Sequence, residues 1–206
     1  MRDGERSAAA GPALEREKIM EAAYRILAAD ERAALSVAEV LAEAGLSTRA
    51  FYRYFDSKDT LLRAMFRRDS ERVLAELQAT AAATPNAVEA LRSWIYGMVR
   101  LTAEPRRRQR ALVLDSAEVT RAKGHRAERA RYEAAMDAVL TQILHRGRAE
   151  GSFPLGRPAL DARYLRAVLD QAVRDQMSAH SPLDADEAAG DLFDFAVRAL
   201  AGHPAT

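Results

Sequence analysis

Five side chains between residues 48 and 58 are suited to contact a nucleic acid: Thr48, Arg49, Tyr52, Arg53 and Lys58. An arginine guanidinium can donate two hydrogen bonds to a guanine edge, and a threonine can bond a base or touch a thymine methyl group. Arginine, lysine and tyrosine side chains also bind phosphate oxygens. The first four residues recur at a spacing that places them on one side of a short helix, so we expect one outward face for base and phosphate contacts.

Two short helices are predicted to hold these side chains. Ser36 is a good N-cap and Glu39 follows it by three residues, so the pair forms a capping box that indicates the start of the first helix. Gly45 is expected to end this helix, because glycine tolerates the left-handed backbone found there. Ser47 then caps a second helix over residues 48–54. The sequence therefore predicts a helix-turn-helix, whose second helix can place its N-terminal side chains in a major groove.

Residues beside the outward face are expected to pack the second helix and to bind phosphate. Phe51 and Phe55 are predicted to turn inward. Ser57 is expected to cap a third helix, and Lys58 at its start adds a positive charge to free backbone N–H groups, which together can bind a phosphate. From these residues alone, a helical hairpin with a solvated polar face remains an equal alternative.

The run of residues 17–65 closely resembles the N-terminal domain of TetR-family transcriptional regulators. The similarity rests on an AGLS turn at residues 44–47, on the aromatic pairs 51–52 and 54–55, and on Ser57-Lys58 followed by two leucines. The resemblance implies that six positions from 48 to 58 face DNA. With Ser47, which begins the second helix, the predicted DNA-binding set is Ser47, Thr48, Arg49, Tyr52, Arg53, Tyr54 and Lys58.

Four positions depart from the family pattern. Val37 stands where the family often has a threonine that bonds a phosphate. Tyr54 stands where a histidine is frequent, although its hydroxyl can still reach a phosphate. Ala34 replaces a common glycine, and Leu41 replaces a common small alanine. Both changes shift the expected packing of the first helix of the helix-turn-helix slightly. We therefore expect the same fold with a changed set of phosphate contacts.

The composition favours an all-α fold. The chain has 206 residues, no cysteine and a formal net charge of +1, and its residue usage indicates helices throughout. Without cysteine there is neither a disulfide framework nor a thiolate site. No apolar run has the length of a signal peptide or a membrane span, so the sequence predicts a cytoplasmic protein with no membrane partner. Because the net charge of the whole chain is small, a DNA-binding surface requires basic residues gathered in one region of the protein.

We predict about nine helices in two domains. Residues 1–11 are expected to form a mobile N-terminal arm, residues 12–60 a three-helix DNA-binding domain with the helix-turn-helix, and residues 61–206 a helical ligand-binding and dimerisation domain. The first helix is predicted over about residues 14–29. A long helix over about residues 58–81 leads from one domain into the other, and it is the predicted coupling element.

A strongly apolar helix after Pro85 is expected in the interior of the second domain. Its simplest interpretation is a packed core. Large, adaptable side chains there and on a later helix also suit the wall of an apolar ligand cavity. The resemblance supports this second interpretation, because TetR-like regulators commonly hold an inducer in this domain, and it implies a small, largely apolar effector. The predicted pocket residues are Trp94, Met98, Leu101, Tyr132, Met136 and Val139.

Residues 106–131, the basic segment, carry nine basic residues against three acidic ones. Three interpretations remain open: a solvated helix pair, a hinge surface against acidic parts of the DNA-binding domain, or a site for an anionic ligand such as the phosphates of an acyl-CoA. Charge runs usually face water, which favours the first.

Two further helices are predicted over about residues 159–177 and 184–200, the second opened by a capping box of Asp184 and Glu187. Their apolar stripes expose more surface than one chain readily covers, which predicts a homodimer, as in the family. A two-fold dimer also sets two recognition helices about 34 Å apart, one turn of DNA. The predicted interface residues are Leu165, Val168, Leu169, Ala172, Leu192, Phe193 and Ala196.

An enzyme is disfavoured because the necessary residues are missing from the sequence. The four histidines are scattered, and no metal-binding spacing, phosphate loop or nucleophile motif occurs, so no cofactor, metal or catalytic residue is predicted. A helical protein–protein adaptor would keep the two apolar helices but gives no reason for the outward basic and aromatic cluster. We therefore expect a repressor that binds a near-palindromic double-stranded DNA operator as a homodimer and is released by a small molecule.

Overall fold

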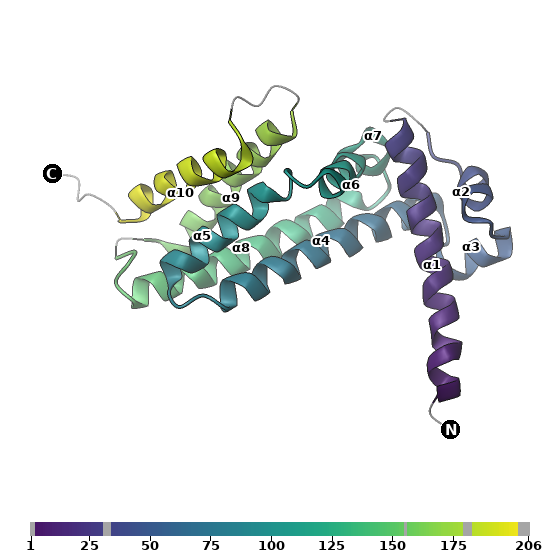
Figure 1. Cartoon of the computed structure of the whole chain (residues 1–206), viewed down its shortest axis with the longest axis horizontal. Coiled ribbons are helices and arrows are strands. Elements are labelled where there is room, and N and C mark those ends of the chain that lie inside the picture. The colour runs from purple at the N-terminus through teal and green to yellow at the C-terminus, as the bar shows by residue number, and fades with distance from the viewer. Residues whose placement is uncertain (1–2, 31–33, 155, 179–182, 202–206) are drawn as a thin grey trace. The chain divides into compact units, whose positions relative to one another are not determined.

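The structure is a computed structural model that describes residues 3–30, 34–154, 156–178 and 183–201, with side chains from residue 13 onward. Within these ranges the secondary structure is helical and contains no strand, which confirms the predicted all-α class (Figure 1). The helices are α1 (Asp3–Ala29), α2 (Val37–Ala44), α3 (Thr48–Tyr54), α4 (Lys58–Ala82), α5 (Ala87–Arg100), α6 (Pro105–Asp115), α7 (Ala117–Thr120), α8 (His125–Ala149), α9 (Pro158–Met177) and α10 (Ala185–Ala201).

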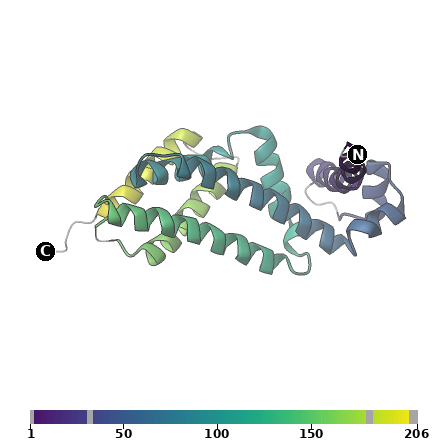
Figure 2. The same ribbon diagram turned by 90° about the horizontal axis from the view of Figure 1, so that it is seen from below.

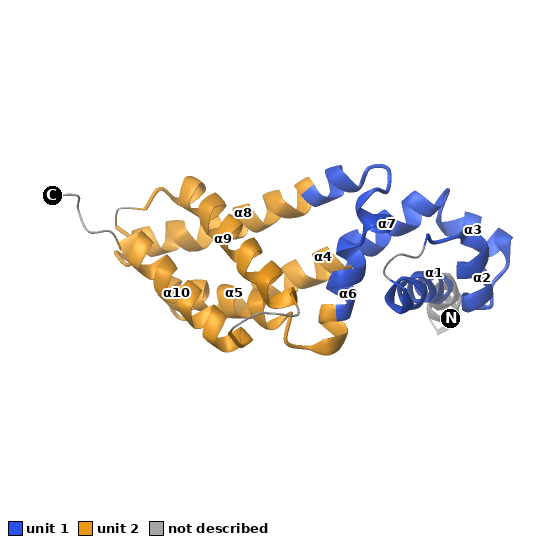
Figure 3. Ribbon diagram, turned by 90° about the horizontal axis from the view of Figure 1, so that it is seen from above, with its two compact units in different colours: residues 1–68, 109–129 blue, residues 69–108, 130–206 orange. Residues whose placement is uncertain are grey.

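The chain divides into two compact units (Figure 3). Unit 1 contains residues 1–68 and 109–129, and unit 2 contains residues 69–108 and 130–206. The sequence predicts one boundary after residue 60 and does not place a second segment in the DNA-binding part. Packing explains the difference, because Val113, Val119 and Ala122 are buried in the same apolar core as residues of α1 to α4.

The helix ends around α2 follow the capping pattern of the sequence. The Ser36 hydroxyl accepts a hydrogen bond from Glu39 N at 3.2 Å, and the Glu39 carboxylate accepts one from Ser36 N at 3.1 Å, which confirms the capping box. Hydrogen bonds from the Ser36 side chain and backbone hold the pKa of Glu39 below its ordinary value. Gly45 ends α2 with φ 64°. The Ser47 hydroxyl accepts from Ala50 N at 3.3 Å and so begins α3 as predicted.

The core of unit 1 holds the two short helices against α1. Helices α1, α2 and α3 contact one another in all three pairs. Large apolar side chains from these helices, from α4 and from α7 supply the packing, and burying one such side chain contributes about 1.5–3 kcal/mol. Prominent among them are Ile19, Met20, Leu27, Leu41, Phe51, Phe55, Leu62, Met65 and Val119.

Helix α1 begins earlier than the sequence predicts. It starts at Asp3, whereas the sequence favours a mobile arm over residues 1–11 and a helix from about Leu14. Residues 3–11 are therefore helical, and residues 1–2 lie outside the described residues. The three consecutive alanines 8–10 favour this extension, because alanine has the highest helix propensity.

Unit 2 packs α5 against α9 and α10, which also contact each other (Figures 1 and 2). Helix α5 begins at Ala87 with Asn86 as its N-cap, slightly after the predicted start at Pro85. The Asp184 carboxylate accepts from Glu187 N at 2.8 Å, so the predicted cap of α10 is present. Among the helices of the described ranges, none is long and apolar enough to cross a membrane.

Candidate nucleic-acid interface

The outward face of α3 carries polar side chains at the predicted positions. Ser47, Thr48, Arg49, Tyr52 and Arg53 are all exposed, and Tyr52 keeps 58% of its surface accessible to solvent. Two guanidinium groups, a phenol and two aliphatic hydroxyls therefore offer hydrogen bonds to base edges and phosphate oxygens from one surface. The predicted exposure of these side chains is observed, and their contact with DNA stays a prediction.

The opposite face of α3 is apolar and fixes the helix in unit 1. Phe51 and Phe55 are fully buried, as predicted, with ring centroids 5.6 Å apart. The rings of Phe51 and Tyr52 meet edge to face with their centroids 5.4 Å apart, and the Arg16 guanidinium lies 5.5 Å from the centre of the Phe55 ring. Aromatic pairs of this kind contribute about 0.5–1.5 kcal/mol beyond their burial. The exposed face of α3 is therefore supported by a packed aromatic base.

Glu15 on α1 contacts two of the predicted DNA-binding side chains. Its Oε2 accepts hydrogen bonds from Arg53 Nη1 and from the Tyr54 hydroxyl, both at 3.0 Å. The hydrogen bond with Tyr54, and then the charge of Glu15, raise the pKa of Arg53 above its ordinary value, so the guanidinium stays charged. Because this ion pair is largely exposed, its contribution to stability is small, and a phosphate can replace the carboxylate as the partner.

Lys58 is the first residue of α4, at the predicted phosphate site. The Ser57 hydroxyl accepts from Thr60 N at 3.2 Å and caps the helix as predicted. The Lys58 ammonium is already bound by the protein, since Nζ lies 2.5 Å from Oε1 of Glu118 in α7. The same carboxylate oxygen accepts a hydrogen bond from Leu35 N at 3.2 Å. The structure thus adds a carboxylate to a site where the sequence indicates only donors.

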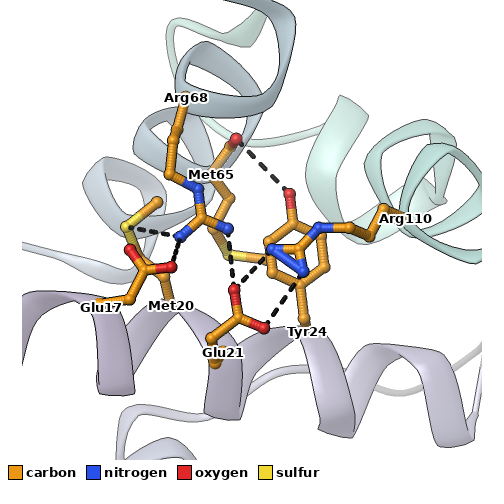
Figure 4. A network of polar contacts seen from close by, with 7 residues as sticks. All are labelled: Glu17, Met20, Glu21, Tyr24, Met65, Arg68 and Arg110. Carbon is orange, nitrogen blue, oxygen red and sulfur yellow. Dashed lines mark hydrogen bonds and ion pairs between the residues drawn. The ribbon is translucent and has the colours of Figure 1, made fainter. Parts of the chain in front are cut away.

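A polar network joins α1 to α4 and α6 within unit 1. Figure 4 shows the Glu21 carboxylate between the guanidinium groups of Arg68 and Arg110. Arg110 binds it with both Nη atoms, at 2.5 and 3.1 Å, and Arg68 Nη2 binds it at 3.0 Å. The Arg110 guanidinium also lies 4.1 Å from the centre of the Tyr24 ring, whose hydroxyl donates to the Met65 carbonyl at 3.5 Å. One carboxylate on α1 therefore binds guanidinium groups from two further helices of unit 1.

The predicted ligand-pocket residues are brought together in unit 2. The indole Nε1 of Trp94 is buried there and has no hydrogen-bond partner among the described residues. A buried donor without a partner costs about 1–3 kcal/mol, so an acceptor on a bound molecule would be favourable at this point. Four of the six residues are buried and two are partly buried in one apolar cluster: Trp94, Met98, Met136 and Val139, with Leu101 and Tyr132.

The predicted dimer residues separate into two groups. Val168 on α9 is exposed and Ala172 is half-buried. The large apolar side chains that α9 and α10 leave exposed are Tyr164, Val168 and Phe195, with 59%, 39% and 47% of their surfaces accessible. These exposed side chains differ from most of the predicted interface residues, because the longest apolar stripe of each helix covers the core of its own chain. Five predicted interface residues are buried in that core: Leu165, Leu169, Leu192, Phe193 and Ala196.

Several arginines of the basic segment form ion pairs or hydrogen bonds inside their own unit. In unit 2, Arg107 binds Glu76 at 2.8 Å, which raises the pKa of Arg107, and Arg108 donates to a backbone carbonyl of α9 at 2.8 Å. In unit 1, Arg110 binds Glu21 of α1. The Arg110 pair matches the second of the three interpretations, contact with acidic residues of the DNA-binding part, and these three arginines are not simply solvated.

Three carboxylates at the candidate interface have no clear signal in the sequence: Glu15, Glu21 and Glu118. Glu15 and Glu21 belong to a charged face of α1 of ordinary composition, and Glu118 is the only charged residue of the short helix α7. Glu15 is 38 residues from Arg53 along the chain, and Glu118 is 60 residues from Lys58. Ion pairs between distant positions leave no periodic pattern in a sequence, so these contacts are visible only in the folded chain.

The comparison with protein families agrees with this geometry. Residues 19–65 match the family model described as bacterial regulatory proteins, tetR family. That range contains all of α2 and α3 and the parts of α1 and α4 that pack on them. No curated protein sequence matches the chain.

Solved structures of bacterial regulators share the fold. The fatty acid degradation regulator FadR from Bacillus halodurans matches with a TM-score of 0.73 at 16% identity, over 89% of this chain and 94% of that chain. FadR from Bacillus subtilis in complex with stearoyl-CoA matches with a TM-score of 0.74 at 17% identity, over 91% and 99%. Reduced NemR from Escherichia coli matches with a TM-score of 0.70 at 20% identity, over 93% and 100%. Residues 19–65 of the chain thus match the tetR family of bacterial regulatory proteins, and the chain as a whole shares the fold of these solved regulators.

Proposed function

We propose that the protein is a ligand-responsive repressor that binds a near-palindromic operator as a homodimer. The observation that carries the proposal is the geometry of α3, which rests on buried aromatic rings and exposes Thr48, Arg49, Tyr52 and Arg53. Donors on the outward face of such a helix can reach base edges, while Lys58 at the start of α4 can reach a phosphate. A packing motif alone would not require this cluster to be exposed.

Homodimer formation is proposed through the open apolar side chains of α9 and α10. Tyr164 and Val168 are four residues apart and so share one face of α9, and Phe195 is exposed on α10. A second copy of the chain would remove these side chains from water and create a symmetric interface. Two recognition helices related by a two-fold axis would then meet half-sites about 34 Å apart.

Selection from random duplex DNA tests operator binding directly. We expect the purified protein to enrich a two-fold symmetric sequence, and its affinity for that duplex to fall steeply as salt rises, because phosphate contacts release counterions. A scrambled duplex of equal length is the control for nonspecific binding. A helical protein–protein adaptor would give no enriched sequence and only the weak, sequence-independent binding of the scrambled duplex.

The effector is proposed to enter the apolar cluster of unit 2. Trp94, Met98 and Met136 offer large side chains that can repack around an apolar molecule, and the Trp94 Nε1 offers one hydrogen bond. The Bacillus subtilis FadR structure contains stearoyl-CoA. Long-chain acyl thioesters, which combine an apolar chain with a carbonyl acceptor, are therefore the first class to test.

Release of the operator is proposed to follow from a population shift. An effector acts in this way if it binds more tightly to a conformation in which the two recognition helices no longer match successive major grooves. A coupling free energy of about 1–3 kcal/mol would weaken operator binding by about 5- to 150-fold.

The single tryptophan of the chain makes effector binding measurable without a label. We expect a long-chain acyl-CoA to change Trp94 fluorescence and to weaken operator binding over the same concentration range. Coenzyme A without an acyl chain is the control for binding through the phosphates alone. If both compounds change the fluorescence and the operator affinity equally, the protein recognises the nucleotide part of the molecule, and the apolar cluster of unit 2 is not the effector site.

A further inference from the structure

Glu118 links three separate segments of unit 1 through one carboxylate oxygen. Its Oε1 lies 2.5 Å from Lys58 Nζ and 3.2 Å from Leu35 N. Leu35 precedes the N-cap of α2, and Lys58 begins α4. The carboxylate therefore contacts the chain just before the helix-turn-helix begins and a few residues after it ends, and we call these two contacts the Glu118 bridge.

The position of Glu118 is fixed by its neighbours in α7. Val119 is fully buried in the core of unit 1, and Ala122 is buried shortly after it. The side chain of Glu118 is only 20% exposed, while that of Lys58 is 37% exposed. Glu118 is thus held at the edge of the core, and Lys58 reaches it from a more open position. A partner arriving from solvent can reach Lys58 more easily than it can displace Glu118.

We propose that the Glu118 carboxylate binds the Lys58 ammonium where a DNA phosphate would otherwise bind it, and that this competition limits the affinity of the protein for DNA. This inference rests on the proposed operator binding. A carboxylate and a phosphate oxygen are both anionic acceptors for one ammonium group, so Lys58 must leave Glu118 before it can neutralise a phosphate. Binding then gains one phosphate contact per subunit and loses one internal ion pair. The negative charge left on Glu118 also repels the incoming backbone.

The contrast with Arg53 supports the choice of this carboxylate. Arg53 and Glu15 have exposed fractions of 53% and 35%, so water screens that pair more strongly. Glu118 in addition accepts a backbone hydrogen bond, which keeps its carboxylate beside Lys58 after the lysine has left. The Glu118 bridge is therefore the stronger of the two internal competitors for DNA phosphates.

Glu118→Gln separates the two contacts of the bridge. The amide oxygen of glutamine can still accept from Leu35 N, whereas the charge that holds Lys58 is removed. Asp115→Asn is a matched control, because it removes one negative charge at the end of α6 from a residue that binds Arg129 at 3.0 Å. Lys58→Ala and the double variant Lys58→Ala/Glu118→Gln test whether any effect passes through Lys58.

Binding of the selected operator and of a scrambled duplex is measured by fluorescence anisotropy from about 50 to 200 mM salt. We expect Glu118→Gln to bind both duplexes about two- to fivefold more tightly per subunit, which is the range of one exposed ion pair. Its plot of log affinity against log salt should keep the wild-type slope, because Lys58 neutralises one phosphate per subunit in both proteins, whereas Lys58→Ala should make the slope shallower by about 0.9 per subunit. Asp115→Asn should match the wild type, and the double variant should match Lys58→Ala.

The proposal is overturned if Glu118→Gln binds no more tightly than the wild type, if Asp115→Asn gives the same gain, or if the gain persists without Lys58. A second readout uses the unchanged protein: the side-chain ammonium resonance of Lys58, assigned by comparison with Lys58→Arg, should shift when operator is added. An unmoved resonance also overturns it. Failure of the wild type to enrich any duplex is a different result, since it contradicts the proposed operator binding itself.

Discussion

Arg49 is the side chain of α3 best placed to read a base. It is exposed near the N-terminal end of the helix, whereas Arg53 is engaged by Glu15. We expect Arg49→Ala to weaken binding of the selected operator by about 1–3 kcal/mol and to relax the preference at one base pair of each half-site. Affinities for operators substituted at each position measure this. Arg121→Ala, an exposed arginine of unit 1 outside the helix-turn-helix, should leave the preference unchanged. An intact preference in Arg49→Ala would show that another residue reads the base.

We expect His125 to make the stability of unit 1 depend on pH. The residue is 3% exposed, neither ring nitrogen has a hydrogen-bond partner among the described residues, and its ring lies 4.7 Å from that of Phe66. Burial, and then the charge of Arg129, lower the pKa of His125 below its ordinary value of 6.5, against the opposing charges of Asp115 and Glu128. Between the lowered pKa and 6.5 the unfolded chain binds more protons than the folded one. The contribution of neutral His125 to the stability of unit 1 is therefore complete above pH 6.5 and is lost as the pH falls below that value.

Urea unfolding at about pH 7.5 and about pH 5.5 measures this effect. We expect the wild type to lose more stability on acidification than His125→Leu, which has no group to protonate at that position. His145→Gln, an exposed histidine of α8, serves as the control and should retain the wild-type difference. Equal acid sensitivity in the wild type and His125→Leu would show that protonation of His125 does not act on folding.

At the scale of helices, the local signals in the sequence are sufficient where a helix end is stabilised by its own neighbours. The capping boxes at Ser36 and Asp184 and the left-handed Gly45 are all present, because each depends on residues within a few positions. The same reasoning predicts the inward and outward faces of α3. Local pattern cannot show which core a helix joins, so the packing of Val119 into unit 1, and with it the partner of Lys58, is visible only in the structure.

Glu21 is predicted to set the stability of the junction between α1, α4 and α6. Glu21→Gln removes the charge that Arg68 and Arg110 share, and leaves two guanidinium groups facing each other. Because these groups are about one-third exposed or less, we expect a loss of about 1 kcal/mol in the free energy of unfolding, above that of a surface pair. The control is Glu43→Gln, whose exposed pair with Arg25 should contribute less than about 0.5 kcal/mol. Chemical denaturation that gave equal losses for both variants would remove any special role for Glu21.

For the whole molecule, we expect the oligomeric state and the operator affinity to depend together on the open apolar side chains of α9 and α10. Val168→Asp and Phe195→Asp each place a charge where we propose that a second copy packs, and desolvating an unpaired carboxylate there is costly. Both side chains are exposed in the single chain, so the fold should survive, which circular dichroism can check. Gln142→Asp introduces the same residue at an exposed position of α8 and should have neither effect.

Light scattering should then find the wild type and Gln142→Asp as dimers, and Val168→Asp and Phe195→Asp as monomers. The monomers should bind a full operator at least about tenfold more weakly, because linked recognition helices bind two half-sites with an effective concentration that separate ones lack. Their affinity for an isolated half-site should stay at the wild-type value, since α3 is unchanged. Dimeric Val168→Asp and Phe195→Asp proteins would place the interface elsewhere. Monomers with full operator affinity would instead show that operator recognition does not require two joined subunits.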